Sequence, residues 1–108
     1  MYKKLNWQAY TSGNRNKITD KIKDVISHNE GCILNFTQFS DLALSLSIEI
    51  EEQHIIQLHD ALAEIITIDD LDQEQINQGS EREWILFLNI SFSQGSGDMK
   101  IIVPTVPG

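Results

Sequence analysis

A polar turn, TSGNRNK, runs from Thr11 to Lys17 and directly precedes an amphipathic segment. If that segment is a helix, the free N–H groups at its start favour a carboxylate or a phosphate. The turn adds hydroxyl and amide groups and two positive charges. We expect Asn35 and Gln38, on the next apolar segment, to hold the amino group or side chain of such a ligand. The candidate ligand-binding residues are Ser12, Gly13, Asn14, Arg15, Asn16, Lys17, Asn35 and Gln38.

A simpler interpretation of the same residues stays open. Asn14 and Asn16 are residue types that cap helix N-termini, and Gln38 could be an exposed strand residue. The sequence does not choose between a ligand site and a capped helix.

The remaining reactive side chains do not predict an enzyme. His54 and His59 are five residues apart, which places them on different faces of a helix. Cys32 is the single cysteine and opens an apolar segment, so we expect its side chain to be buried and to pack as a small apolar group. The acidic run from Asp69 to Glu74 lacks the spacing of a calcium loop. We therefore expect no catalytic residues, no metal site and no cofactor.

Charge and composition narrow the classes of partner. The 108 residues are 41% hydrophobic and carry a net charge of −8. Residues 1–23 hold six basic residues and one acid, a balance of +5, and residues 24–108 balance at −13. This acidity argues against nucleic-acid binding. No apolar stretch reaches the length of a membrane helix and the N-terminus has no signal-peptide pattern, so we expect no membrane association. A lone cysteine fits a cytoplasmic location.

Hydrophobic periodicity predicts alternating strands and helices. Leu42 to Ile50 alternates perfectly and is the clearest strand, joined to the preceding one by a hairpin at Ser40-Asp41. Gly31 should end the first helix in a left-handed conformation. In order, the elements are a strand at 4–10, a helix from Asn16 to just before Gly31, strands at 32–39 and 42–50, a helix over 55–65, and strands at 66–68 and 84–93.

This order predicts an α+β fold of the ferredoxin-like βαββαβ type, an antiparallel sheet with two helices on one face. We expect residues 1–68 to form that domain and 69–83 to be an acidic linker. We expect residues 84–108 to form a C-terminal β-hairpin, which completes the sheet or pairs with a partner subunit.

Several segments carry a family pattern: KITDKIKDVISHNEGCIL (17–34), LALSLSIEI (42–50) and the following QLHDALAEI. They resemble the ACT domain, a small regulatory domain of amino-acid metabolism. More narrowly, ILNFTQ (33–38), LSLSI (44–48) and REWILFLNIS (82–91) resemble the N-terminal regulatory region of bacterial phosphoserine phosphatases.

The resemblance implies a non-catalytic regulatory module, a homodimer that binds a small amino acid at a subunit interface, with serine as the first ligand to test. A degenerate ACT-like module that dimerises or binds a protein, with no metabolite ligand, is the alternative. Asn16 favours the alternative, because it stands where amino-acid-binding ACT domains usually have glycine.

Overall fold

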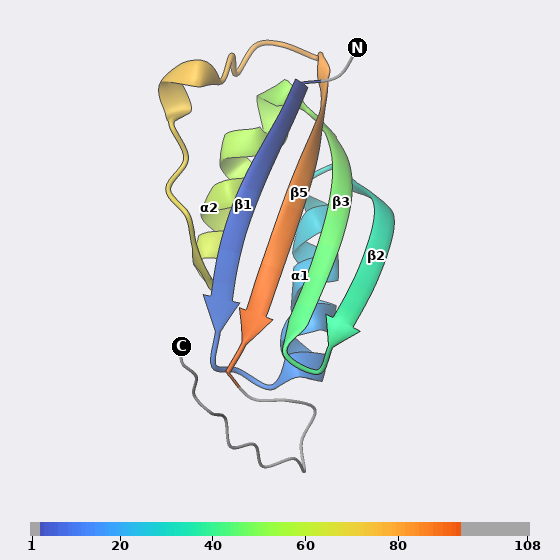
Figure 1. The fold of residues 1–108 in the computed structure, drawn as a ribbon. Coiled ribbons are helices and arrows are strands. Elements are labelled where there is room, and N and C mark those ends of the chain that lie inside the picture. Colours follow the sequence, from blue (N-terminus) through green and yellow to red (C-terminus); the bar gives the residue numbers. More distant parts are fainter. Residues whose placement is uncertain (1–2, 94–108) are drawn as a thin grey trace.

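The computed structural model of the protein describes residues 3–93, which form one sheet with two α-helices. The helices cover the same face of the sheet, and the other face is open (Figure 1). The predicted α+β class is confirmed, whereas the second arm of the predicted hairpin lies outside the described residues. The elements are β1 Lys3–Thr11, α1 Arg15–His28, β2 Cys32–Ser40, β3 Ala43–Glu51, η1 Glu52–His54, α2 Ile55–Ala63, β4 Thr67–Ile68, η2 Gln73–Gln75 and β5 Glu83–Phe92.

The sheet is mixed, with the strand order β2-β3-β5-β1-β4. All neighbours are antiparallel except β1 and β5, which run parallel from the pair Lys3–Trp84 to the pair Thr11–Phe92. The prediction of an antiparallel sheet is therefore wrong for this one pair. β5 also has strand neighbours on both sides, so within the described sheet it has no free edge for a hairpin partner or another subunit.

The central place of β5 follows from its side chains. Its helix-facing residues are all at most 4% exposed, and only the middle of the sheet is covered by both helices. The chain must also return to the far end of the sheet before β5 begins, because β4 lies beside Ala9 and Tyr10 near the end of β1, whereas β5 starts beside Lys3. Residues 69–82 make that return. The buried side chains of β5 are Trp84, Leu86, Leu88, Ile90 and Phe92.

Helix and sheet side chains form one hydrophobic core. Ile22 and Ile26 of α1 are fully buried and lie four residues, about one turn, apart, as an amphipathic helix requires. Leu58 of α2 is also fully buried. They pack with alternate residues of β3, whose other residues face the open side. Each buried aliphatic side chain contributes roughly 1.5–3 kcal/mol. Neither α1 nor α2 has the length and apolar composition to cross a lipid bilayer.

The connection 69–82 is tied to the domain along its length, with Ile76 buried in the core. At its start, the backbone N–H of Asp69 donates to the Gln8 carbonyl (3.0 Å), and its Oδ2 accepts from the Gln8 amide (2.9 Å). Further along, Glu52 Oε2 accepts from the Asn77 amide at 2.8 Å. The acidic segment is thus a packed part of the domain surface.

The turn after α1 differs from the prediction at Gly31. The left-handed residue is Glu30, with φ 67°, and the amide of Gly31 donates to the Ile26 carbonyl at 2.9 Å. Glycine is needed at 31 for space, because an added Cβ would lie 2.9 Å from Ile26 Cγ2 and 3.1 Å from Ile48 Cγ2. Close helix–sheet packing therefore explains this glycine.

Candidate functional site

The start of α1 is capped by Asn14, whose Oδ1 accepts from the Lys17 amide at 3.0 Å. Gly13 lies before it, where an added Cβ would be 2.8 Å from Cγ1 of Ile18. Its amide donates to the hydroxyl of Thr11 (3.1 Å). Asn14 thus caps the helix as the capping interpretation predicts, whereas Asn16 lies inside α1 and is not its cap.

A groove of about 340 Å³ lies beside this helix start, between α1 and the edge strand β2. It joins residues of the first turns of α1 to Phe36 and Gln38, which stand opposite the core residues Leu46 and Leu44 and therefore face the helix side. The groove is lined by Arg15, Asn16, Thr19, Asp20, Lys23, Phe36 and Gln38.

Two cations, Arg15 and Lys23, and one acid, Asp20, line this groove and leave it with a net positive charge. The Nζ of Lys23 lies 4.5 Å from the centre of the Phe36 ring, a cation–π contact. Arg15 donates from Nη1 to Asn16 Oδ1 at 3.3 Å, and its Nε is buried without a hydrogen-bond partner among the described residues. A carboxylate bound here could meet both charges and the Gln38 amide.

The other predicted ligand residues do not line this groove. Asn35 stands opposite Ser47, whose side chain faces the open side of the sheet, and it accepts from the Phe36 amide at 2.9 Å. Ser12 lines a separate depression with residues 63–67. Lys17 is exposed. The structure therefore joins Arg15, Asn16 and Gln38 and separates them from Asn35, Ser12 and Lys17.

Lys23 and Phe36 are groove residues that the sequence analysis missed. Arg15, Thr19 and Lys23 are spaced by four residues, so they share one helix face. That spacing is a signal that could have identified Lys23. No local signal exists for Phe36, because its place beside α1 depends on how β2 pairs with β3.

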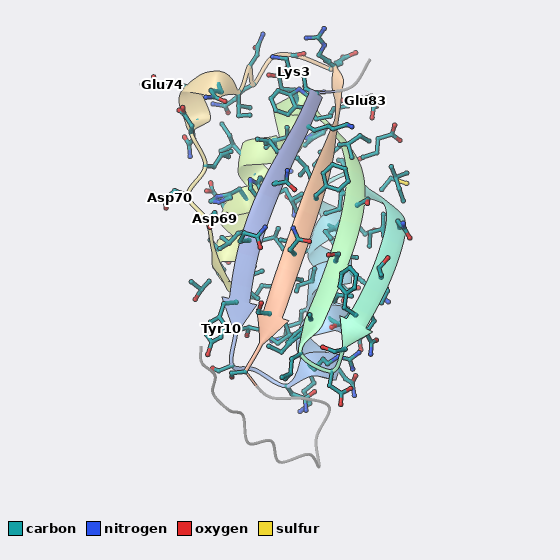
Figure 2. All side chains as sticks on the ribbon, viewed as in Figure 1. Lys3, Tyr10, Asp69, Asp70, Glu74 and Glu83 are labelled. Carbon is teal, nitrogen blue, oxygen red and sulfur yellow. The ribbon has the colours of Figure 1, made fainter. Side chains whose placement is uncertain are left out.

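The opposite end of the domain is acidic. Glu83 of β5 stands directly across from Glu51 of β3, and Glu49 lies two residues before Glu51 on β3. Burial and the charges of Glu49 and Glu51 raise the pKa of Glu83. Lys3 lies at this end of the sheet, and Tyr10 at the other end (Figure 2).

Glu52 shows the reverse behaviour, although it is only 7% exposed. Burial raises the pKa of Glu52. Hydrogen bonds from the Asn77 amide and Ser80 and the charge of Lys3 lower it by more, so the net pKa lies below the ordinary value. The indole N–H of Trp84 also favours the charge, without completing a well-formed hydrogen bond. Glu52 is therefore a charged structural anchor.

Other reactive side chains do not come together. The His28 ring lies 2.7 Å from the Asp24 carbonyl, and His59 lies 2.6 Å from the Asp69 carbonyl. Cys32 is exposed at the start of β2, so the prediction that it is buried is wrong. Within residues 3–93, no three His, Cys, Asp or Glu side chains are placed to hold a metal ion.

Comparisons with known proteins identify no relative. No protein-family model, no curated protein and no solved structure matches the chain significantly.

Proposed function

We propose that this chain is a non-catalytic regulatory domain that binds a small amino acid in the groove between α1 and β2. The observation that carries the proposal is the meeting of Arg15, Lys23 and Gln38 from two elements in one depression. The two cations suit a carboxylate, while Gln38 can accept from or donate to the rest of the ligand. Serine is the first ligand to test, on the ACT resemblance.

The sheet supports a ferredoxin-like origin for this domain. If β5 is left out of the order β2-β3-β5-β1-β4, the remaining order is β2-β3-β1-β4. That is the strand order of a ferredoxin-like sheet, in which all neighbours are antiparallel. We propose that the domain is a ferredoxin-like, ACT-type unit into which β5 is inserted between β1 and β3.

Thermal unfolding with each of the twenty amino acids tests ligand binding. A ligand at 100 times its Kd should stabilise the domain by about 2.7 kcal/mol, which raises Tm by several degrees. Arg15→Gln and Lys23→Gln should remove the shift. Lys21→Gln is the matched control, because Lys21 is an exposed cation of α1 outside the groove. The absence of a shift with every amino acid would contradict the proposal.

A second candidate function is an interaction module without a metabolite ligand. The observation that favours it is the exposure of large apolar side chains along β2, with Phe39 68% and Leu34 52% exposed. A stable assembly in light scattering, together with no ligand shift, would support this second function over the first.

A further inference from the structure

We infer that the groove between α1 and β2 takes a dicarboxylic amino acid, with glutamate as its best match. The inference rests on the proposed amino-acid binding and names the class of ligand. It assigns one carboxylate to Arg15 and Gln38, the other carboxylate to Lys23, and the ammonium group to Asp20. Along α1 the groove charges are positive, negative and positive, and those of glutamate follow the complementary order.

The groove residues of α1 lie in two neighbouring rows, because residues four apart share one face of a helix. Arg15, Thr19 and Lys23 form the inner row, and Asn16 and Asp20 form the outer row. The inner row is the one nearer the sheet, since Arg15 and Thr19 are half-buried and Lys23 contacts β2. Asp20 is exposed and lies between the two cations in sequence. The outer wall therefore presents a negative charge between two positive ends.

The two cations stand at opposite ends of the groove. Arg15 and Lys23 are eight residues apart, so their Cα atoms are separated by about 12 Å along the helix axis. α1 and β2 run in opposite directions (Figure 1), so Phe36 lies beside Lys23 and Gln38 lies further towards the start of α1. Gln38 thus shares the end of the groove with Arg15. One carboxylate reaches both cations only if both long side chains bend inwards, whereas two carboxylates on one ligand meet one cation each.

The three charges of the groove are not neutralised by one another. Asp20 has no cation within ion-pair distance among residues 3–93, although Lys23 lies one turn further along the same helix. The ammonium group of Lys23 lies instead 4.5 Å from the centre of the Phe36 ring, which holds it in the groove. Arg15 donates from Nη1 to Asn16, and its Nε has no partner in the described part of the chain. All three charges are therefore available to a ligand.

The order of these charges selects one class of ligand. Phosphate or a simple dicarboxylate suits the two cations, but it places negative charge beside Asp20 with nothing to compensate it. A neutral amino acid pairs with Asp20 and one cation and leaves the other cation unmatched. An amino acid with a second carboxylate offers a partner to all three charges, and charge-assisted hydrogen bonds are the strong ones.

The charge around the groove also favours a ligand with a net negative charge. Residues 1–23 balance at +5 and include both groove cations, and the exposed Lys17 and Lys21 lie on the same helix. The acidic residues around Glu83 lie at the opposite end of the domain (Figure 2). A surface of one sign raises the local concentration of a ligand of the other sign.

Calorimetric titration of the full chain with related probes tests the inference. L-Glutamate should bind, and L-glutamine, in which an amide replaces the side-chain carboxylate, should bind about tenfold or more weakly. Glutarate, which lacks the ammonium group, should also bind about tenfold or more weakly. Each of these two probes loses one charged contact. L-Serine, which is shorter and has a single carboxylate, should bind more weakly than glutamate.

Two substitutions assign the contacts. Lys23→Gln should weaken glutamate binding by about tenfold and glutamine binding much less, because glutamate alone of the two carries the second carboxylate. Asp20→Asn should remove the preference for glutamate over glutarate. Lys21→Gln is the matched control and should leave these ratios unchanged, since Lys21 is an exposed cation of α1 outside the groove. Circular dichroism should show that all three variants are folded, as each substituted side chain is exposed.

The outcomes separate this inference from the proposed function. Glutamine or serine binding as tightly as glutamate would overturn the dicarboxylic ligand and leave amino-acid binding standing. Equal weakening of glutamate and glutamine by Lys23→Gln would do the same. Glutarate binding as tightly as glutamate would overturn the role of Asp20. If no amino acid binds, both proposals fail.

Discussion

The Glu52 carboxylate accepts a hydrogen bond from the Asn77 amide at 2.8 Å, across 25 residues of sequence. Two backbone hydrogen bonds flank it: the Glu52 amide donates to the Arg82 carbonyl, and the Gln53 amide donates to the Ser80 carbonyl. This short stretch therefore attaches the whole return connection to the start of α2. The connection in turn delivers the chain to the beginning of β5.

Removing this carboxylate should loosen the connection. We expect Glu52→Ala to lower the free energy of unfolding by about 1–3 kcal/mol, because the backbone N–H of Asn77 loses its charged acceptor. Hydrogen exchange at the Asn77 amide should accelerate in the same variant. Glu74→Ala is the control, because Glu74 is exposed on the same connection, and it should change stability by less than about 0.5 kcal/mol. Equal effects of the two substitutions would contradict the anchoring role.

The acidic end of the sheet should make stability depend on pH. The pKa of Glu83 is raised in the folded state, so the folded chain holds this proton more tightly than the unfolded chain. Stability then falls as pH rises from the ordinary glutamate pKa through the raised value. Glu83→Gln should be more stable than the natural protein at pH 7, and the difference should vanish below the ordinary pKa. Urea titrations at several pH values measure this; a less stable Glu83→Gln at pH 7 would refute it.

Glu52 should act in the opposite direction. Its pKa is lowered in the folded state, so its stabilising effect is present above the ordinary glutamate pKa and is lost as pH falls through the lowered value. The stability difference between the natural protein and Glu52→Gln should therefore shrink on acidification. A difference that stays constant down to low pH would show that the charge of Glu52 does not contribute.

In the turn after α1, two neighbouring residues share the roles that one glycine often has: Glu30 adopts the left-handed conformation, and Gly31 allows close packing. Gly31→Ala should destabilise the domain by about 1–3 kcal/mol, because the new Cβ crowds Ile26 and Ile48. Glu30→Gly should stabilise it by up to about 1 kcal/mol, since glycine adopts a φ of 67° without strain. Gly79→Ala is a neutral control, as its Cβ would lie 3.6 Å from Oδ1 of Asn77, an ordinary contact distance. Chemical denaturation measures all three, and a harmless Gly31→Ala would contradict the packing argument.

The insertion of β5 predicts how the chain can be divided. A fragment of residues 1–68 should be unfolded, because it loses the five buried side chains of β5 and leaves β1 and β3 without their shared neighbour. Each of these side chains contributes roughly 1.5–3 kcal/mol of burial free energy. The loss of all five, together with the strand pairing, exceeds a typical net free energy of unfolding of about 5–15 kcal/mol. A fragment of residues 1–93 keeps the described core and should fold. Circular dichroism of both fragments decides the matter, and a folded 1–68 fragment would refute it.

The local elements, and three of the residues that line the groove between α1 and β2, could be predicted from the sequence. Period-two and helical hydrophobic patterns predict the strands and helices in their correct order, because burial of one face is a local pattern. The residue types near Asn14 predict its capping role, and Arg15, Asn16 and Gln38 of the predicted ligand set do meet in the groove.

Tertiary structure alone decided the strand neighbours and the surroundings of each side chain. β5 has the same alternating sequence whether it lies at an edge or in the centre, so its parallel pairing with β1 had no local signal. The exposure of Cys32 and the contact of Lys23 with Phe36 likewise follow from β2 being the edge strand. The reason is physical: strand order depends on the relative free energies of pairing between segments far apart in sequence, which no single segment encodes.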